Sequence, residues 1–230
     1  MTDAAKPNPL IELLITLIIP SLILMKLSSP ENLGAVNALL LALAFPLFWG
    51  ARDLLMRRKL NLFAALGLVN ILLTGGIGLL QLDTHWLAVK EAGIPALLGI
   101  AVAISAYTRY PLVRVLLYTP ALIDVERIQN SLAERGNHAA FESRLKIATW
   151  MLAGSFLFSS VMNYFLATWI VVSPTGTPAF NEELGRLTLL SYPMIALPST
   201  LIMMAALYFL GRSIRELAGL KFTDVLKGYA

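Results

Sequence analysis

The sequence contains no cysteine and few charged residues. Without cysteine, no disulfide, thiol chemistry or thiolate metal site is possible, and cysteine usage says nothing about the compartment. Charged residues make up 14% of the 230 residues, whereas hydrophobic residues make up 57%. Soluble domains carry about 25% charged residues, so this chain has too little charge for the polar shell of a soluble core. The composition predicts a protein whose solvent is the lipid bilayer.

Sequence motifs of common enzyme classes are also missing. The chain has no H-E-x-x-H, no G-x-S-x-G and no nucleotide-binding loop. Its two histidines, His85 and His138, fall in segments predicted for opposite sides of the membrane, so they cannot act together. The net charge of +4 is sorted between loops rather than gathered on one soluble face. We therefore expect a protein that is not an enzyme, holds no cofactor or metal ion, and does not bind nucleic acid.

Six apolar segments are long enough to cross a membrane as α-helices, which takes about 20 residues each. The predicted spans are 10–27, 30–55, 60–80, 84–108, 147–172 and 187–211. Start signals support them: Ser28 and Glu31 have capping-box spacing, and Asp83 can cap the fourth span after a tight hairpin at Gln81. Pro193 and Pro198 predict a bend or break in the last span. The predicted fold is an all-α bundle of six transmembrane helices, forming one integral membrane domain over residues 1–230.

The orientation follows from lysine and arginine, which favour the cytoplasmic side. With Lys6 inside, the outside set is only Lys26, Lys90 and Arg186. The other 15 basic residues, 18 less 3, fall inside, so both termini are predicted to be cytoplasmic. These residues are Lys6, Arg52, Arg57, Arg58, Lys59, Arg109, Arg114, Arg127, Arg135, Arg144, Lys146, Arg212, Arg215, Lys221 and Lys227.

The longest connection, residues 109–146, is predicted to be cytoplasmic. Ile123, Ile128 and Leu132 recur at roughly helical spacing among charged residues, which predicts an amphipathic helix over 120–135 that stops at Gly136. Asn137 is expected to start a helix that continues into the fifth span. Two interpretations stay open for the amphipathic helix: it lies on the membrane surface, or it is a docking surface for a partner protein.

Lys90 and Glu91 are the charged residues placed most deeply in a predicted span. An ionisable residue inside a span is a functional-site hypothesis by default. Asp83 lies seven residues before Lys90, on the same helix face, so we expect Lys90 to reach outward and pair with a carboxylate, in the first place Asp83. The alternative is that Lys90 and Glu91 contact a substrate or ion in an outward-facing vestibule.

The fifth span carries a polar stripe of Ser155, Ser159 and Asn163, each four residues from the last. Because lipid offers no hydrogen-bond partners, the stripe is expected to face other helices. It forms either a dry hydrogen-bonded interface or the lining of a polar path. Asn70 and Thr74 in the third span are the expected partners.

Two groups of residues resemble known bacterial membrane-protein families. The first is a basic loop, a helix ending in Leu-Thr, an acidic turn, an aromatic residue and a lysine, as in the central pattern of intracellular septation protein A; here these are Arg57-Arg58-Lys59, Gly67-Leu68-Val69, Leu73-Thr74, Asp83, Trp86 and Lys90. The second resembles a poorly characterised, related family of proteobacterial inner-membrane proteins, through residues 180–186, Ser191-Tyr192-Pro193 and Pro198-Ser199. Septation protein A is shorter and has fewer spans, so the long connection and the sixth span lie outside the likeness.

The resemblance implies a multipass protein of the bacterial inner membrane with a role in envelope maintenance and no established chemistry. Our first hypothesis is a non-enzymatic protein that works through contacts with other membrane proteins or with a second copy of itself. The second is a small transporter or channel whose kinked helices line a polar path. Six spans without charge at mid-depth favour the first hypothesis, whereas the prolines and the Asn163 stripe favour the second.

Overall fold

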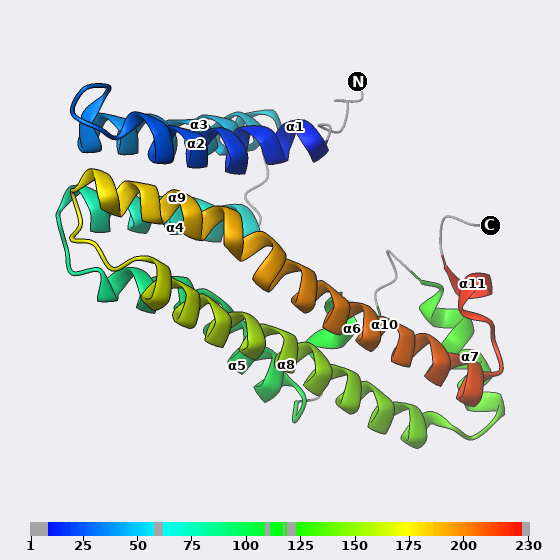
Figure 1. Cartoon of the computed structure of the whole chain (residues 1–230). Helices are drawn as coiled ribbons and strands as arrows, with labels where there is room; N and C mark the ends of the chain where they lie inside the picture. Colours follow the sequence, from blue (N-terminus) through cyan, green and yellow to red (C-terminus); the bar gives the residue numbers. More distant parts are fainter. Residues whose placement is uncertain (1–8, 58–61, 109–110, 117, 119–122, 227–230) are drawn as a thin grey trace. The chain divides into compact units, whose positions relative to one another are not determined.

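The computed structural model describes residues 9–57, 62–108, 111–116, 118 and 123–226, and most of these residues are helical (Figure 1). Within these ranges, β-type pairing is limited to one antiparallel bridge, between Ile123 and Leu226. A helix lies in each of the six segments predicted to span the membrane. The prediction of an all-α protein is therefore confirmed.

The helices follow one another with short connections. The chain begins with α1 (Pro9–Leu13), the π-helical η1 (Leu14–Ile18) and α2 (Ile19–Leu27), followed by α3 (Gly34–Arg57), α4 (Leu62–Leu79) and α5 (His85–Ser105). The second half contains α6 (Leu112–Leu116), α7 (Val125–Glu134), α8 (His138–Ile170), α9 (Pro178–Ser191), the π-helical η2 (Tyr192–Ala196), α10 (Leu197–Ala218) and α11 (Phe222–Val225).

Four helices of the described chain are long and apolar enough to cross a membrane. They are Gly34–Arg52, His85–Ser105, His138–Ile170 and the continuous Pro178–Ala218. Two shorter apolar helices, Leu14–Leu27 and Leu66–Leu79, lie in the first and third predicted spans. Large apolar side chains are widely exposed on these helices, among them Leu97, Ile100, Leu157 and Phe165, as expected of surfaces that face lipid. The protein is a helical membrane protein.

The second predicted span starts later than the sequence indicated. Helix α3 begins at Gly34 and not at Pro30, and Ser28 is the C-cap of α2. The Ser28 hydroxyl donates to the carbonyl of Leu24, 2.8 Å away, at the end of α2. Asn32 donates to the carbonyl of Lys26 at 3.2 Å. These contacts serve the end of α2, so the capping-box prediction is wrong and the intervening residues form a turn.

The predicted hairpin between the third and fourth spans is confirmed. Gln81 has a φ of 53°, and the N–H of Leu82 donates to the carbonyl of Ile77 at 3.0 Å. The Asp83 carboxylate accepts from the N–H of His85 at 2.7 Å, which satisfies a free donor where α5 begins. The side chain of Asp83 is thereby committed to the start of α5.

Pro193 and Pro198 alter the last span without breaking it. A five-residue π-helical segment, η2, surrounds Pro193, and the chain stays helical from Pro178 to Ala218. A proline removes one backbone donor from the helix, and π-helical turns accommodate such irregularities. The helix also begins earlier than predicted, where the Thr177 hydroxyl accepts from the N–H of Phe180 at 3.1 Å.

The chain divides into two compact units. The first comprises residues 1–94 and 161–194, and the second comprises residues 95–160 and 195–230. Helices α5 and α8 each contribute to both units. The expectation of one integral membrane domain stays a prediction.

In the first unit, α2 packs against both α3 and α9. Gly185 of α9 allows the close approach, since a Cβ there would lie 2.8 Å from the carbonyl oxygen of Ser21. One turn earlier, the buried Asn181 donates to the carbonyl of Ala35 at 2.8 Å and to the hydroxyl of Ser28 at 3.0 Å. These contacts fix α9 against the turn that joins α2 to α3.

In the second unit, a core forms where α7 and α11 lie beside α10 (Figure 1). Its fully buried side chains are Val113, Ile123, Ile128, Leu132, Phe141, Leu145, Leu210 and Ile214. The N–H of Asp124 donates to the carbonyl of Val225 at 2.7 Å, which joins the start of α7 to the end of α11. Tyr118 belongs to the same core, and burial raises the pKa of its phenol.

The amphipathic helix exists, but its apolar face lies against the chain itself. Helix α7 covers Val125–Glu134 with Asp124 as its cap, and Gly136 ends it with a φ of 67°, as predicted. Ile128 and Leu132 are each 0% exposed. They pack in the core of the second unit, so this apolar face is covered by the chain itself. A position of α7 on the membrane surface and its use as a docking surface stay predictions. Helix α8 then begins at His138, next to the predicted Asn137.

Candidate functional site

The strongest candidate site is formed by Lys90 on α5. The side chain of Lys90 is only 5% exposed. Its neighbours in the sequence include the apolar Leu87 and Val89, and α5 is long and apolar enough to cross a membrane. Because α5 begins at His85, Lys90 lies in its second turn. A charge taken into an apolar environment must be paired and hydrogen-bonded, so its partners define the site.

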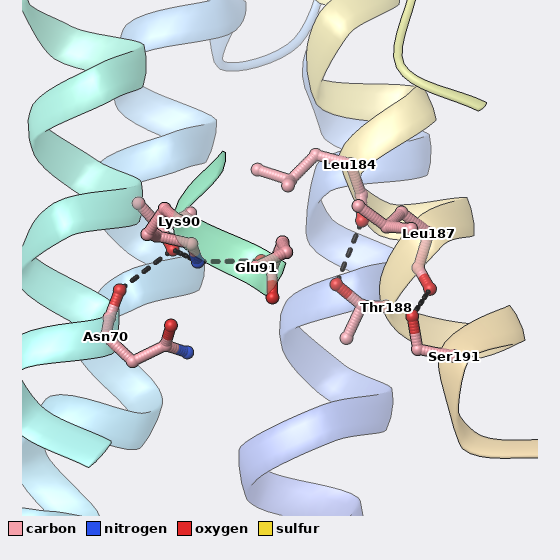
Figure 2. A network of polar contacts seen from close by, with 8 residues as sticks. Asn70, Lys90, Glu91, Leu184, Leu187, Thr188 and Ser191 are labelled. Carbon is pink, nitrogen blue, oxygen red and sulfur yellow. Dashed lines mark hydrogen bonds and ion pairs between the residues drawn. The ribbon is translucent and has the colours of Figure 1, made fainter. Parts of the chain in front are cut away.

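Two side chains satisfy the Lys90 ammonium. Its Nζ lies 2.6 Å from Oε1 of Glu91 and donates to the Thr74 hydroxyl at 2.7 Å. The Thr74 hydroxyl in turn donates to the carbonyl of Asn70 at 2.9 Å, one turn back on α4. The polar contacts thus run from Asn70 through Thr74 and Lys90 to Glu91, and they join α4 to α5 (Figure 2).

The structure corrects the predicted partner of Lys90. A carboxylate is present, as expected, but it belongs to Glu91 and not to Asp83. Asp83 instead accepts from the backbone of His85. The sequence reasoning placed the pair by helical spacing alone, whereas the short Asp83 side chain is held by the N-terminus of α5. The five predicted residues Asn70, Thr74, Lys90, Glu91 and Asp83 therefore divide into a four-residue contact chain and a separate helix cap.

The two charges of the pair differ in exposure. Lys90 is 5% exposed at its side chain, whereas Glu91 is 24% exposed. Figure 2 shows Glu91 extending from α5 toward the part of α9 that carries Thr188 and Ser191. The buried ammonium of Lys90 thus contacts a carboxylate that is partly exposed. This arrangement suits charge neutralisation or a contact made through Glu91.

Thr188 and Ser191 were missed by the sequence reasoning. The Thr188 hydroxyl donates to the carbonyl of Leu184 at 2.9 Å, and the Ser191 hydroxyl donates to that of Leu187 at 2.7 Å. Both hydroxyls are satisfied within α9, so neither depends on the ion pair. The available signal was their spacing, since residues three apart lie on one face of a helix.

Asn181 is the other missed polar residue. It is 1% exposed, and the hydrogen bonds of its side-chain amide join α9 to Ser28 at the end of α2 and to Ala35 of α3. In the sequence it stood out only as part of the resemblance in residues 180–186. A buried amide with two donors needs partners, but a single sequence does not say that Ala35 and Ser28 supply them.

The polar stripe of α8 finds its partner on α10. The Ser155 hydroxyl donates to the carbonyl of Ser199 at 3.0 Å, and the hydroxyls of Ser159 and Ser199 share a hydrogen bond of 2.7 Å. Ser155 is 7% exposed. Asn163 also takes part in a polar interaction. The predicted partners Asn70 and Thr74 are therefore wrong for the two serines, because the last span lies beside them.

Metal-binding groups are not assembled in the described part of the chain. No three His, Asp or Glu side chains there lie close enough together to hold a metal ion. The expectation that the protein uses no cofactor stays a prediction, as does the expectation that it is not an enzyme.

In comparisons with known proteins, no family model, no curated protein and no solved structure matches the chain. The resemblance to septation protein A therefore stays a prediction, and the contacts described above carry the functional argument.

Proposed function

We propose that the chain crosses the inner membrane of a bacterium six times, with both termini in the cytoplasm. The distribution of 15 basic residues inside and 3 outside supports this topology. The two shorter apolar helices fit it as well. Residues 9–27 are continuously helical, as are residues 62–79. At about 1.5 Å a residue, runs of this length approach the roughly 30 Å of a hydrocarbon core.

Reporter fusions test the topology. A reporter active only in the periplasm should give signal after Leu27, Leu82 or Gly176, and none after Arg135 or Ala230. Periplasmic signal from the fusion after Ala230 would contradict the six-span arrangement.

Within this topology, we infer a non-enzymatic protein that acts through contacts with other membrane proteins. The observation that favours this inference over a transporter is the bonding of Ser155 and Ser159 to Ser199 within the chain. Two members of the polar stripe thus close an interface between helices of the same unit, which is how a packed bundle uses such residues. The resemblance to septation proteins suggests envelope maintenance as the process that these contacts serve.

The absence of native cysteine permits a direct experiment, because each introduced thiol is unique. Single cysteines at Ser155, Ser159 and Asn163 are treated with a charged, water-soluble thiol reagent in intact membranes. We expect little labelling at all three positions. A cysteine at Ala179, which is exposed next to the start of α9, provides the labelled control, and one at Leu157, 62% exposed on an apolar face, provides the lipid-facing control.

A transporter is the second candidate, and the ion pair of the buried Lys90 with the partly exposed Glu91 favours it. Transporters place ionisable residues at membrane depth along their ion or substrate paths. Strong labelling at Ser159 and Asn163, at the level of Ala179, would reveal an aqueous path and replace the first proposal with this one. Lys90→Met with normal stability and lost cellular function would locate the path at the ion pair.

A further inference from the structure

A groove in the second unit combines apolar and basic side chains on one face of α10. Its volume is about 920 Å³, and its lining includes Met204, Tyr208, Arg212, Arg215, Glu216 and Lys221. The groove belongs neither to the Lys90 site nor to the polar stripe. Its size falls in the range of small-molecule sites, which are typically 300–1,000 Å³.

The lining changes character along the helix in two parallel rows. One row runs from Met204 to Tyr208 to Arg212, and the other from Leu207 to Gly211 to Arg215, each in steps of four. Steps of four residues keep to one helix face. Over about 16 Å of helix, this face passes from apolar side chains, through Tyr208, to two arginines. An aromatic residue between an apolar and a charged zone is typical of the level of lipid headgroups.

The basic end of the groove carries uncompensated positive charge. Arg212 is paired with Glu216 at 2.6 Å, and Glu216 also lies 3.8 Å from Arg144 of α8. Arg215 and Lys221 are exposed, and neither is paired with a carboxylate among the described residues. Three basic residues against one carboxylate leave a charge of +2 on the lining. This charge fits a phosphodiester.

The apolar end is open as well. Met204 is 54% exposed and Tyr208 is 73% exposed. An acyl chain can lie along these side chains while the headgroup phosphate reaches Arg215 and Lys221. The carboxylate of Glu216 repels any further anionic group of a ligand close to Arg212. A single lipid supplies both the apolar chain and the anionic group that this face requires.

We propose that this groove is a binding site for an anionic phospholipid of the cytoplasmic leaflet, with the phosphate at Arg215 and Lys221. The proposal rests on the six-span topology, in which the end of α10 meets the inner headgroups; the reporter fusions test that topology separately. Basic residues at an anionic membrane surface each contribute roughly fivefold in affinity.

Native mass spectrometry of the delipidated full-length protein in a neutral detergent tests the site. Phosphatidylglycerol and phosphatidylcholine with identical acyl chains are titrated separately, and the first binding event is measured. We expect wild-type protein to prefer phosphatidylglycerol. The double variant Arg215→Gln/Lys221→Gln should lose about 30-fold in phosphatidylglycerol affinity and keep its phosphatidylcholine affinity, while Met204→Gln should weaken both.

Lys146→Gln is the matched control, since Lys146 is an exposed basic residue of α8 outside the groove lining. An equal loss in this variant, or no loss in the double variant, would overturn the site. Displacement of phosphatidylglycerol by millimolar inorganic phosphate would identify a free-phosphate site instead. If the wild-type protein runs as a dimer and the double variant as a monomer, with lipid affinity unchanged, the face belongs to a second copy. Unchanged thermal unfolding in lipid-free detergent shows that the double variant is folded.

Discussion

The two compact units differ in the polar contacts that their buried side chains make. In the first unit, an ion pair and an amide carry the polar contacts: Lys90 with Glu91, and Asn181 with Ser28 and Ala35. In the second, the stripe of α8 uses neutral hydroxyls that bond to Ser199, and a core of fully buried apolar side chains packs against one face of α7. Charge at depth is costly to leave unpaired, whereas a hydroxyl contributes little. The first unit should therefore be the more sensitive to polar substitutions and the second to apolar ones.

The largest effect is expected from breaking the ion pair. Glu91→Gln leaves the Lys90 ammonium buried with only neutral partners, the Thr74 hydroxyl and the introduced amide, and loss of one partner of a buried pair costs about 3–5 kcal/mol. Denaturant unfolding in detergent measures this. The double variant Lys90→Met/Glu91→Leu should recover much of the loss, because no charge then remains. Equal losses of unfolding free energy in the single and double variants would show that the charge interaction between Lys90 and Glu91 does not contribute to stability.

Substitution in the second unit's core ranks next. Leu132→Ala removes a side chain that is 0% exposed and should cost about 2–5 kcal/mol. Leu157→Ala, at a position 62% exposed on α8, is the control and should change little in detergent. If Leu132→Ala is as mild as the control, α7 does not pack on the chain as described.

A smaller loss is expected where α2 and α9 approach closely. In Gly185→Ala the new Cβ meets the Ser21 carbonyl oxygen and the Met25 side chain, at 2.8 and 2.7 Å. Overpacking of this kind typically costs about 1–3 kcal/mol. Gly154→Ala on α8 introduces a Cβ with nothing within 4 Å and should be neutral. The difference in melting temperature between these two variants measures the contact.

The smallest effect is expected at the hydroxyl stripe. Ser199→Ala removes the bond to Ser159 but keeps the carbonyl that accepts from Ser155. Interhelical hydrogen bonds in membranes are worth about 0.6 kcal/mol, so the loss should be of that order. Thr200→Ala, at the exposed neighbouring position, is the control. A loss above that of Glu91→Gln would reverse the comparison between the units.

The apolar runs made the helices predictable, because a span must satisfy its backbone internally over a fixed length. The helix of α7 and its end at Gly136 were also predictable from periodicity and a turn residue. What covers that helix was not, since an apolar face at helical spacing fits lipid, a partner or the chain's own core equally well. Only the tertiary contacts of Ile128 and Leu132 decide between them.

The candidate site was predictable in its central residue and not in its partners. Lys90 stood out because lysine is rare at that depth. Spacing along one helix suggested Asp83, but the hydrogen bond that Lys90 donates to Thr74 crosses from α5 to α4, and a single sequence carries no such pairing information. Asp83 was already used by the N–H of His85. Competition between local capping and longer-range pairing thus decided the outcome.

The apolar face of α7 packs against residues that are synthesised much later, which matters for folding during synthesis. Val225, which is buried in the same core as Ile128, lies 225 − 128 = 97 residues further along the chain. At a synthesis rate of about 5–20 residues per second, the last residue that packs on the apolar face of α7 is synthesised roughly 5–20 seconds after Ile128. During that interval a nascent chain displays Ile128 and Leu132 to whatever binds exposed apolar helices, so the insertion machinery or a chaperone must tolerate or shield them.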